Sequence, residues 1–231
     1  MRFIGAAGFG LAACIDVARE SIGLDLNGAR VAVQGFGAVG KHAARFLAQK
    51  GTVLVAASDT GGTLADPSGL DIEVLIALKE TGRALRNHDK GTKLPADAII
   101  DVDCDIWILA ARPDMIRADN VSRLRTRMMP QGANIPYTPE AEKTLHDRGV
   151  LVVPDFIANA GGVICASIEY QGGTQRAAFD SIDERIRANT RAVLEESRST
   201  KTLPRTAALA LAERRVRAAM QTRRWRYTKS H

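Results

Sequence analysis

The chain has 231 residues, of which 45% are hydrophobic and 25% charged, and it carries 20 glycines, three cysteines and a formal net charge of +6. These values lie close to globular averages and exclude collagen-like, disordered and disulfide-scaffold proteins. Its apolar runs fall well short of the ~20 residues that span a bilayer, and charges interrupt the first apolar stretch before a signal-peptide core forms. We therefore expect a cytoplasmic protein without a membrane segment.

The first part of the chain alternates helical and strand patterns. We expect a helix over residues 6–21, a buried strand over 30–34, a helix over 38–50 closed by Gly51, and a second strand over 52–58. Each crossover of such a βαβ unit returns the chain to the same end of the sheet. The pattern predicts a parallel sheet with helices on both faces.

The alternation continues through the rest of the chain. Three further strands are expected over residues 105–109, 127–130 and 150–153. Further helices are expected over residues 71–81, from the Thr138-Pro139-Glu140 start to Gly149, from Gly162 to Tyr170, over 181–197 and over 203–226. The predicted fold is α/β: a Rossmann-like, doubly wound, mostly parallel sheet over residues 1–171, with a C-terminal helical extension over 172–231 packed on it.

The last predicted helix carries much of the basic excess. Leu209, Ala212, Val216 and Met220 recur at intervals of three and four, which predicts one buried stripe. The basic residues fall largely on the other faces, beside Trp225 and Tyr227: Arg214, Arg215, Arg217, Arg223, Arg224, Arg226 and Lys229. This spacing favours a solvated helix end over a nucleic-acid patch.

Cysteine and histidine spacing argues against a metal site. Cys14, Cys104 and Cys165 are odd in number and widely spaced, so we expect buried, reduced thiols. The four histidines show neither HxxxH nor HExxH spacing.

A glycine-rich turn follows the first strand. Residues Gly35, Phe36, Gly37, Ala38, Val39 and Gly40 fit GxGxxG at the point where a strand gives way to a helix. The first glycine permits the tight turn, the second lets backbone approach a pyrophosphate, and the third allows close helix packing; the helix amides then face the anion. We predict a dinucleotide site. A purely structural turn and a methyltransferase loop are the alternatives, the latter disfavoured because Gln34 stands where an acid is expected.

Asp59 ends the second strand, 19 residues after Gly40. A carboxylate there accepts hydrogen bonds from an adenosine ribose. The acid would repel a 2′-phosphate, and residues 60–63 supply no cation to offset it. NAD is therefore favoured over NADP, which stays possible.

Three stretches of small and amide residues follow later strands. They contain Ala110 and Ala111, Asn134, and Asn159 respectively. Ligands of an open parallel sheet lie outside the carboxyl ends of its strands, and all three stretches fall there. The alanines would let a flat cofactor lie against backbone, and the asparagines would bond ribose hydroxyls or the nicotinamide amide. The alternative is that the asparagines merely cap turns.

Seven segments form a set of motifs in a fixed order: Leu26 to Gly37, Gly69-Leu70-Asp71, Gly132-Ala133-Asn134, Thr138-Pro139-Glu140-Ala141, Pro154-Asp155, Asn159-Ala160-Gly161-Gly162-Val163 and Arg205-Thr206-Ala207-Ala208. Over nearly the whole chain they resemble the dehydrogenases that act on glutamate, leucine, phenylalanine and valine, with the glutamate branch nearest. The resemblance implies oxidative deamination of an L-amino acid to a 2-oxo acid, hydride transfer to nicotinamide, and a homo-oligomer.

The resemblance also exposes a gap. Its members hold substrate in an N-terminal domain whose glycine-rich motif carries a catalytic lysine and whose later segment carries a catalytic aspartate. No GGxKGG-like stretch occurs here, so no catalytic residue is assigned. We expect only the cofactor-binding half, inactive alone and in need of a missing or separate substrate domain.

Two positions depart from the resembling family. Ala7 stands where the family's Ala-Thr-Gly segment has threonine, and Ala166 stands where glutamate-specific members have serine. The alternative to an enzyme half is a non-catalytic dinucleotide-binding regulatory or interaction module.

Overall fold

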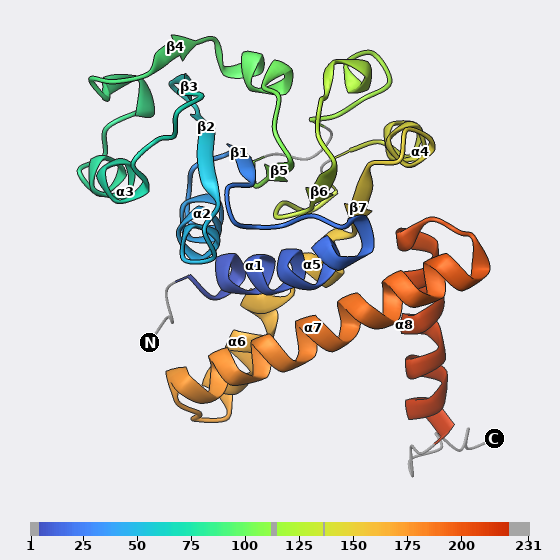
Figure 1. Cartoon of the computed structure of the whole chain (residues 1–231). Helices are drawn as coiled ribbons and strands as arrows, with labels where there is room; N and C mark the ends of the chain where they lie inside the picture. Colours follow the sequence, from blue (N-terminus) through green and yellow to red (C-terminus); the bar gives the residue numbers. More distant parts are fainter. Residues whose placement is uncertain (1–4, 112–114, 136, 222–231) are drawn as a thin grey trace, which may run out of the picture.

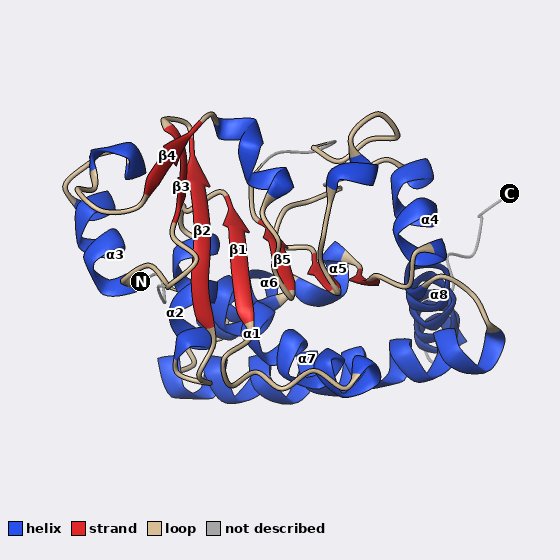
Figure 2. Ribbon diagram, turned by 45° about the horizontal axis from the view of Figure 1, so that its top comes forward, coloured by secondary structure: helices blue, strands red, loops and turns tan. Residues whose placement is uncertain are grey.

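A computed structural model describes residues 5–111, 115–135 and 137–221 of the chain (Figure 1). The described residues form one seven-stranded sheet in the order β4-β3-β2-β1-β5-β6-β7 (Figure 2). The strands are β1 (Arg30–Gln34), β2 (Val53–Asp59), β3 (Gly62–Ala65), β4 (Thr92–Leu94), β5 (Ile106–Leu109), β6 (Met128–Pro130) and β7 (Leu151–Val153). The helices are α1 (Ala6–Ala18), α2 (Gly40–Ala48), α3 (Ile72–Glu80), α4 (Pro139–Asp147), α5 (Asp155–Ala158), α6 (Gly161–Tyr170), α7 (Gln175–Thr200) and α8 (Pro204–Gln221).

The sheet confirms the predicted Rossmann-like α/β fold. The pairings from β2 through β1, β5 and β6 to β7 are parallel, as the alternating strands and helices predicted. Two short antiparallel strands, β3 and β4, extend the β2 edge and were not predicted. Each of them contains a single large apolar residue, Leu64 and Leu94, so they lack the continuous apolar run that marks strands as short as β5 and β7.

Helices cover both faces of the sheet. On one face α1 packs between the sheet and the long α7, with α2 beside it (Figure 1). The opposite face carries α4 and short 3₁₀ segments around the fully buried Trp107. The cysteines Cys14, Cys104 and Cys165 are all buried, as expected, and form no disulfide among the described residues.

Side-chain caps mark the starts of three helices. The side chains of Asp71 and Thr138 cap α3 and α4 by accepting hydrogen bonds from Val74 N and Ala141 N. α7 is longer than predicted because Thr174 caps it, ahead of the first buried apolar position at Ala178. The four-residue α5 was not predicted.

The predicted buried stripe on the last helix is wrong. Leu209, Val216 and Met220 are 51%, 58% and 65% exposed, and Ala212 is exposed as well. α8 packs on α7 and β7 near its start, through the buried Pro204, Ala207 and Ala208 (Figure 1). Further along, Arg214 and Arg215 reach Glu196 and Asn189 of α7, and these polar contacts leave the apolar residues of α8 uncovered. Periodicity shows that a helix has an apolar face, and it does not show that a neighbour covers that face. The basic cluster from Arg223 onward, with Trp225 and Tyr227, lies outside the described residues.

A carboxylate on α1 forms ion pairs that link α7 to α1 and to the end of α2. Asp16 on α1 accepts from Arg187 on α7 (2.8 Å), from Lys50 after α2 (3.2 Å) and from Arg19 (3.3 Å). Its side chain is only 19% exposed. Burial alone would raise the pKa of Asp16, but the hydrogen bonds from Arg187 and Lys50 outweigh it and hold that pKa below its usual range.

We predict that Asp16→Asn lowers the free energy of unfolding at pH 7 by about 1–3 kcal/mol, the range for charged hydrogen bonds. The folded pKa of Asp16 is depressed, so its contribution is fully present above the unfolded pKa of about 3.9 and is lost as pH falls through the folded value. Urea unfolding at pH 7 and near pH 2 should therefore show the difference between wild type and variant shrinking in acid.

The matched control is Asp180→Asn on α7, whose carboxylate is 73% exposed and pairs with Arg176 four residues earlier on the same helix. It should change stability by less than about 0.5 kcal/mol. An equal loss in both variants would contradict a special role for Asp16.

Candidate functional site

The glycine-rich turn lies between β1 and α2, at the carboxyl edge of the sheet. Gly35 has φ +92°, and a Cβ there would lie 2.7 Å from the carbonyl of Ala110 at the end of β5. A Cβ on Gly40 would collide with the carbonyl oxygen of Gly35 and lie 2.7 Å from Cγ1 of Val33. Both glycines are therefore required by close packing, as the motif predicted.

Gly37 differs from the other two glycines. A Cβ at Gly37 would meet no atom within 4 Å, so space is open in front of this backbone. No side chain caps the start of α2, and the amides of residues 37–40 have no hydrogen-bond acceptor among the described residues. Unpaired amides at a helix N-terminus with open space before them suit an anion such as a pyrophosphate.

Phe36 contributes only its backbone to this turn. Its side chain is fully buried, and its amide donates to the carbonyl of Ser58 on β2 (2.8 Å). The ring anchors the turn in the core and is not placed to contact a ligand. Ala38 is exposed beside Gly37.

A cavity of about 500 Å³ lies beside this turn, at the carboxyl edge of the sheet. It brings together five of the predicted residues, from four separate segments: Val39, Ala110, Ala111, Asn134 and Asn159. Its other lining residues are Ala7, Gly132, Ala133, Gly162 and Val163. These five were outside the predicted set, although Gly132, Ala133 and Gly162 belong to the stretches of small and amide residues that follow the later strands.

The two predicted asparagines contact each other at the wall of the cavity. Nδ2 of Asn159 donates to Oδ1 of Asn134 at 2.9 Å, which leaves the Asn134 amide nitrogen and the Asn159 carbonyl oxygen available to a ligand. The neighbouring Ile135 has φ +48°, a left-handed conformation rare for a β-branched residue. Its amide donates to Oδ2 of Asp155 (2.9 Å), which holds the strained loop in place.

A buried polar cluster behind these loops centres on Arg205 of α8. Arg205 donates to Glu142 of α4 (2.8 Å), to Asp155 (3.2 Å) and to the fully buried Gln131 (2.8 Å). Oε1 of Gln131 also accepts from the amide of Asp155. Burial raises the pKa of Glu142 despite the attraction of Arg205. The cluster ties α8 to the two loops that carry the asparagines, a role that sequence spacing gave no means to foresee.

Asp59 ends β2, the position that the sequence predicted, and its carboxylate already accepts hydrogen bonds from protein groups. Its side chain is 8% exposed; Oδ2 accepts from Nζ of Lys79 (2.7 Å) and the amide of Leu85 (2.9 Å), and Oδ1 accepts from Gly61 N (2.8 Å). Burial pushes its pKa up, but these donors outweigh burial and hold that pKa below its usual range. Asp59 does not line the cavity, and its charge is neutralised by Lys79 on α3.

Among the described residues, no group of three or more His, Cys, Asp or Glu side chains is arranged to hold a metal ion. No helix in residues 5–111, 115–135 and 137–221 has the length and apolarity needed to cross a bilayer.

Comparison with known proteins agrees with this geometry. Residues 3–224 match the family of glutamate/leucine/phenylalanine/valine dehydrogenases. The chain belongs to this family. It is 37% identical to a glutamate dehydrogenase of Aeropyrum pernix over 96% of this chain and 56% of that enzyme, and 32% identical to an NAD-specific glutamate dehydrogenase of Staphylococcus aureus over 94% and 53%.

A solved family structure has the same fold. The hetero-hexameric glutamate dehydrogenase of Thermus thermophilus superposes with a TM-score of 0.84 at 30% identity, over 96% of this chain and 54% of its own. The chain therefore spans about half the length of the family members that it matches. The matched half contains the glycine-rich turn and the cavity described above.

The two glycines of the turn give a matched pair of substitutions. Gly35→Ala should lower the free energy of unfolding by about 2–4 kcal/mol, because it adds a Cβ at positive φ against the Ala110 carbonyl. Gly37→Ala adds the same methyl group in open space and should change stability by less than about 1 kcal/mol. Urea denaturation of both variants checks this; equal losses would contradict the close approach of β1 and β5.

Proposed function

We propose that this chain binds a nicotinamide dinucleotide in the cavity and acts as the cofactor half of an amino-acid dehydrogenase. The reaction would be oxidative deamination of an L-amino acid to a 2-oxo acid, in which the nicotinamide ring accepts the hydride. One observation carries the proposal: the unpaired amides of residues 37–40 open beside a cavity lined by Asn134 and Asn159. The names of the family's glutamate dehydrogenases support it.

Each group in the cavity has a distinct task. The amides at the start of α2 would hold the pyrophosphate, with Gly37 allowing close approach. The small Ala110 and Ala111 would let the cofactor lie against the end of β5, and the asparagine pair would fix the nicotinamide and its ribose. These contacts would orient one face of the nicotinamide ring toward substrate.

The acid–base chemistry must come from elsewhere. The described residues that line the cavity include no Asp, Glu, His, Lys or Arg. We propose that a substrate domain, within a longer chain or as a separate polypeptide, supplies those groups across the cleft, and that copies of the complete unit associate as a homo-oligomer.

The first test is binding by the 231-residue chain. Calorimetric titration with NADH should give a dissociation constant below about 1 mM, equivalent to about −4 kcal/mol. Gly37→Ala should weaken binding at least about tenfold, since its methyl group stands where the pyrophosphate approaches. Absence of binding at millimolar NADH would refute the cofactor site.

Turnover is tested separately from binding. With NAD and L-glutamate, L-leucine, L-phenylalanine or L-valine, the purified chain should produce no NADH, because the cavity offers no general base. Measurable turnover would show that a base within this chain had been overlooked.

For the adenosine end of the cofactor we propose NAD as the preferred form. Lys79 neutralises Asp59, and Arg86 lies close by, its Cδ 3.7 Å from the position of a Cβ on Gly61. The repulsion of a 2′-phosphate by Asp59 is therefore reduced. The relative from Staphylococcus aureus is named NAD-specific, which supports the preference.

Lys79→Met tests the part played by this ion pair. Removing Lys79 leaves the Asp59 carboxylate uncompensated, so NADPH binding should weaken about tenfold more than NADH binding. Titrating both cofactors into wild type and variant gives the ratio, and Lys90→Met, an exposed lysine outside this ion pair, is the control. Tighter binding of NADPH than NADH by the wild type would overturn the NAD preference.

A further inference from the structure

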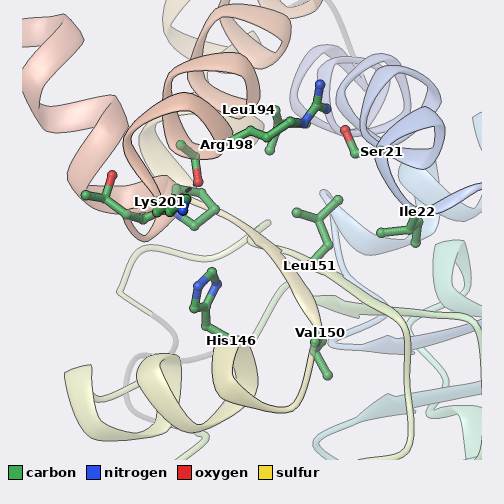
Figure 3. Close-up of a pocket in the computed structure, with 12 residues that line it drawn as sticks. Ser21, Ile22, His146, Val150, Leu151, Leu194, Arg198 and Lys201 are labelled. Carbon is green, nitrogen blue, oxygen red and sulfur yellow. Dashed lines mark hydrogen bonds between the residues drawn. The ribbon is translucent and has the colours of Figure 1, made fainter.

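A second groove lies at the amino-terminal end of β7 (Figure 3). It has a volume of about 350 Å³ and forms where β7 begins, whereas the cofactor cavity lies beyond the strand's other end. The end of α4, the 3₁₀ turn after α1 and the turn between α7 and α8 close its sides. Its lining residues are Ser21, Ile22, His146, Gly149, Val150, Leu151, Leu194, Ser197, Arg198, Lys201, Thr202 and Pro204.

The groove combines an apolar floor with a cationic rim. Leu151 and Leu194 lie at its base, and Leu194 is only 7% exposed. Figure 3 shows Arg198 extending toward Ser21, while His146 points from α4 toward the α7–α8 turn. None of the lining residues is acidic.

Two exposed cations, Arg198 and Lys201, stand at the end of α7 on the rim of the groove. Arg187 of α7 and Arg214 of α8 have acidic partners, Asp16 and Glu196, whereas Arg185 and Arg191 of α7 have none among the described residues. Among the described residues, the side chains of Arg198 and Lys201 make no ion pair or hydrogen bond. Two unneutralised cations beside an apolar floor attract a ligand that carries both an anionic group and an apolar body.

The backbone fixes one of these cations at the rim. Lys201 ends α7 with φ +53°, and its amide donates to the carbonyl of Ser197. The hydroxyl of Ser197 donates to the carbonyl of Thr202 at 2.6 Å. The turn that presents Lys201 is therefore held by hydrogen bonds at two points.

We propose that this groove is a binding site for a small organic anion. Its acidic group would pair with Arg198 and Lys201, and its apolar body would pack on Leu151 and Leu194. The volume stands at the lower end of the range for small-molecule sites, about 300–1,000 Å³, which suits one compact ligand. The site is separate from the proposed cofactor site and does not depend on that function.

The competing explanation is that the cations serve the helix. α7 ends at Thr200, and basic residues near a helix C-terminus stabilise its dipole without any ligand. The two explanations differ in whether an anion with an apolar tail binds saturably.

The test uses hexanoate as probe and amide chemical shifts of the full chain as readout. Hexanoate should shift amides of residues 146–151 and 194–203 and saturate at millimolar concentration. The neutral hexanamide should not bind, and inorganic phosphate should bind more weakly because it lacks the apolar body. Arg198→Gln and Lys201→Gln should each weaken hexanoate at least about fivefold.

Arg185→Gln, an exposed arginine of α7 outside the groove, is the matched control and should leave hexanoate binding unchanged. Thermal melting of each variant verifies folding. Non-saturating shifts, shifts outside the groove, equal binding of hexanamide or phosphate, or an equal loss in Arg185→Gln would each overturn the proposal. NADH titrations are independent of all these outcomes.

Discussion

The close approach of β1 and β5 at the carboxyl edge of the sheet is the constraint on which the cofactor cavity depends. β1 lies in the middle of the sheet and pairs with both β2 and β5, so the chain must turn sharply out of it at Gly35 before α2 starts at Gly40. Gly35 makes this turn at positive φ, and the missing Cβ leaves room for the Ala110 carbonyl. At the start of α2, a Cβ on Gly40 would collide with the carbonyl oxygen of Gly35, so this position also needs glycine. The cavity wall and the free amides of α2 both follow from these two contacts.

Long-range ion pairs, together with buried apolar residues of α7 and α8, hold the C-terminal helices in place. Asp16 joins α1, α2 and α7, and Arg205 joins the start of α8 to Glu142 and Asp155. The Arg205 cluster also contacts the loops before Asn134 and Asn159, so the position of α8 and the shape of the cavity are physically linked. A buried charge without its partner is costly, which makes these pairs strong constraints on the arrangement of the elements.

Much of the fold was predictable because its signals are local. The strand at 30–34, the glycine turn and the caps at Asp71 and Thr138 depend on residues within one or two turns of each other. Because carboxyl ends of parallel strands share one edge, the gathering of Val39, Ala110, Asn134 and Asn159 was predictable as well. The short β3 and β4 were not, since the pairing of β3 with β2 and of β4 with β3 depends on contacts rather than on their own pattern.

The sequence by itself determined the family, the parallel direction of the main strands and five of the residues that meet at the cofactor cavity. Only the tertiary structure decided the environment of individual side chains. It paired Asp59 with Lys79, left the apolar stripe of α8 exposed, buried Phe36 and Gln131, and left Arg198 and Lys201 without acidic partners. Backbone geometry and periodicity follow from neighbours in the chain, whereas burial and charge pairing depend on segments far apart in sequence that only the folded chain brings together.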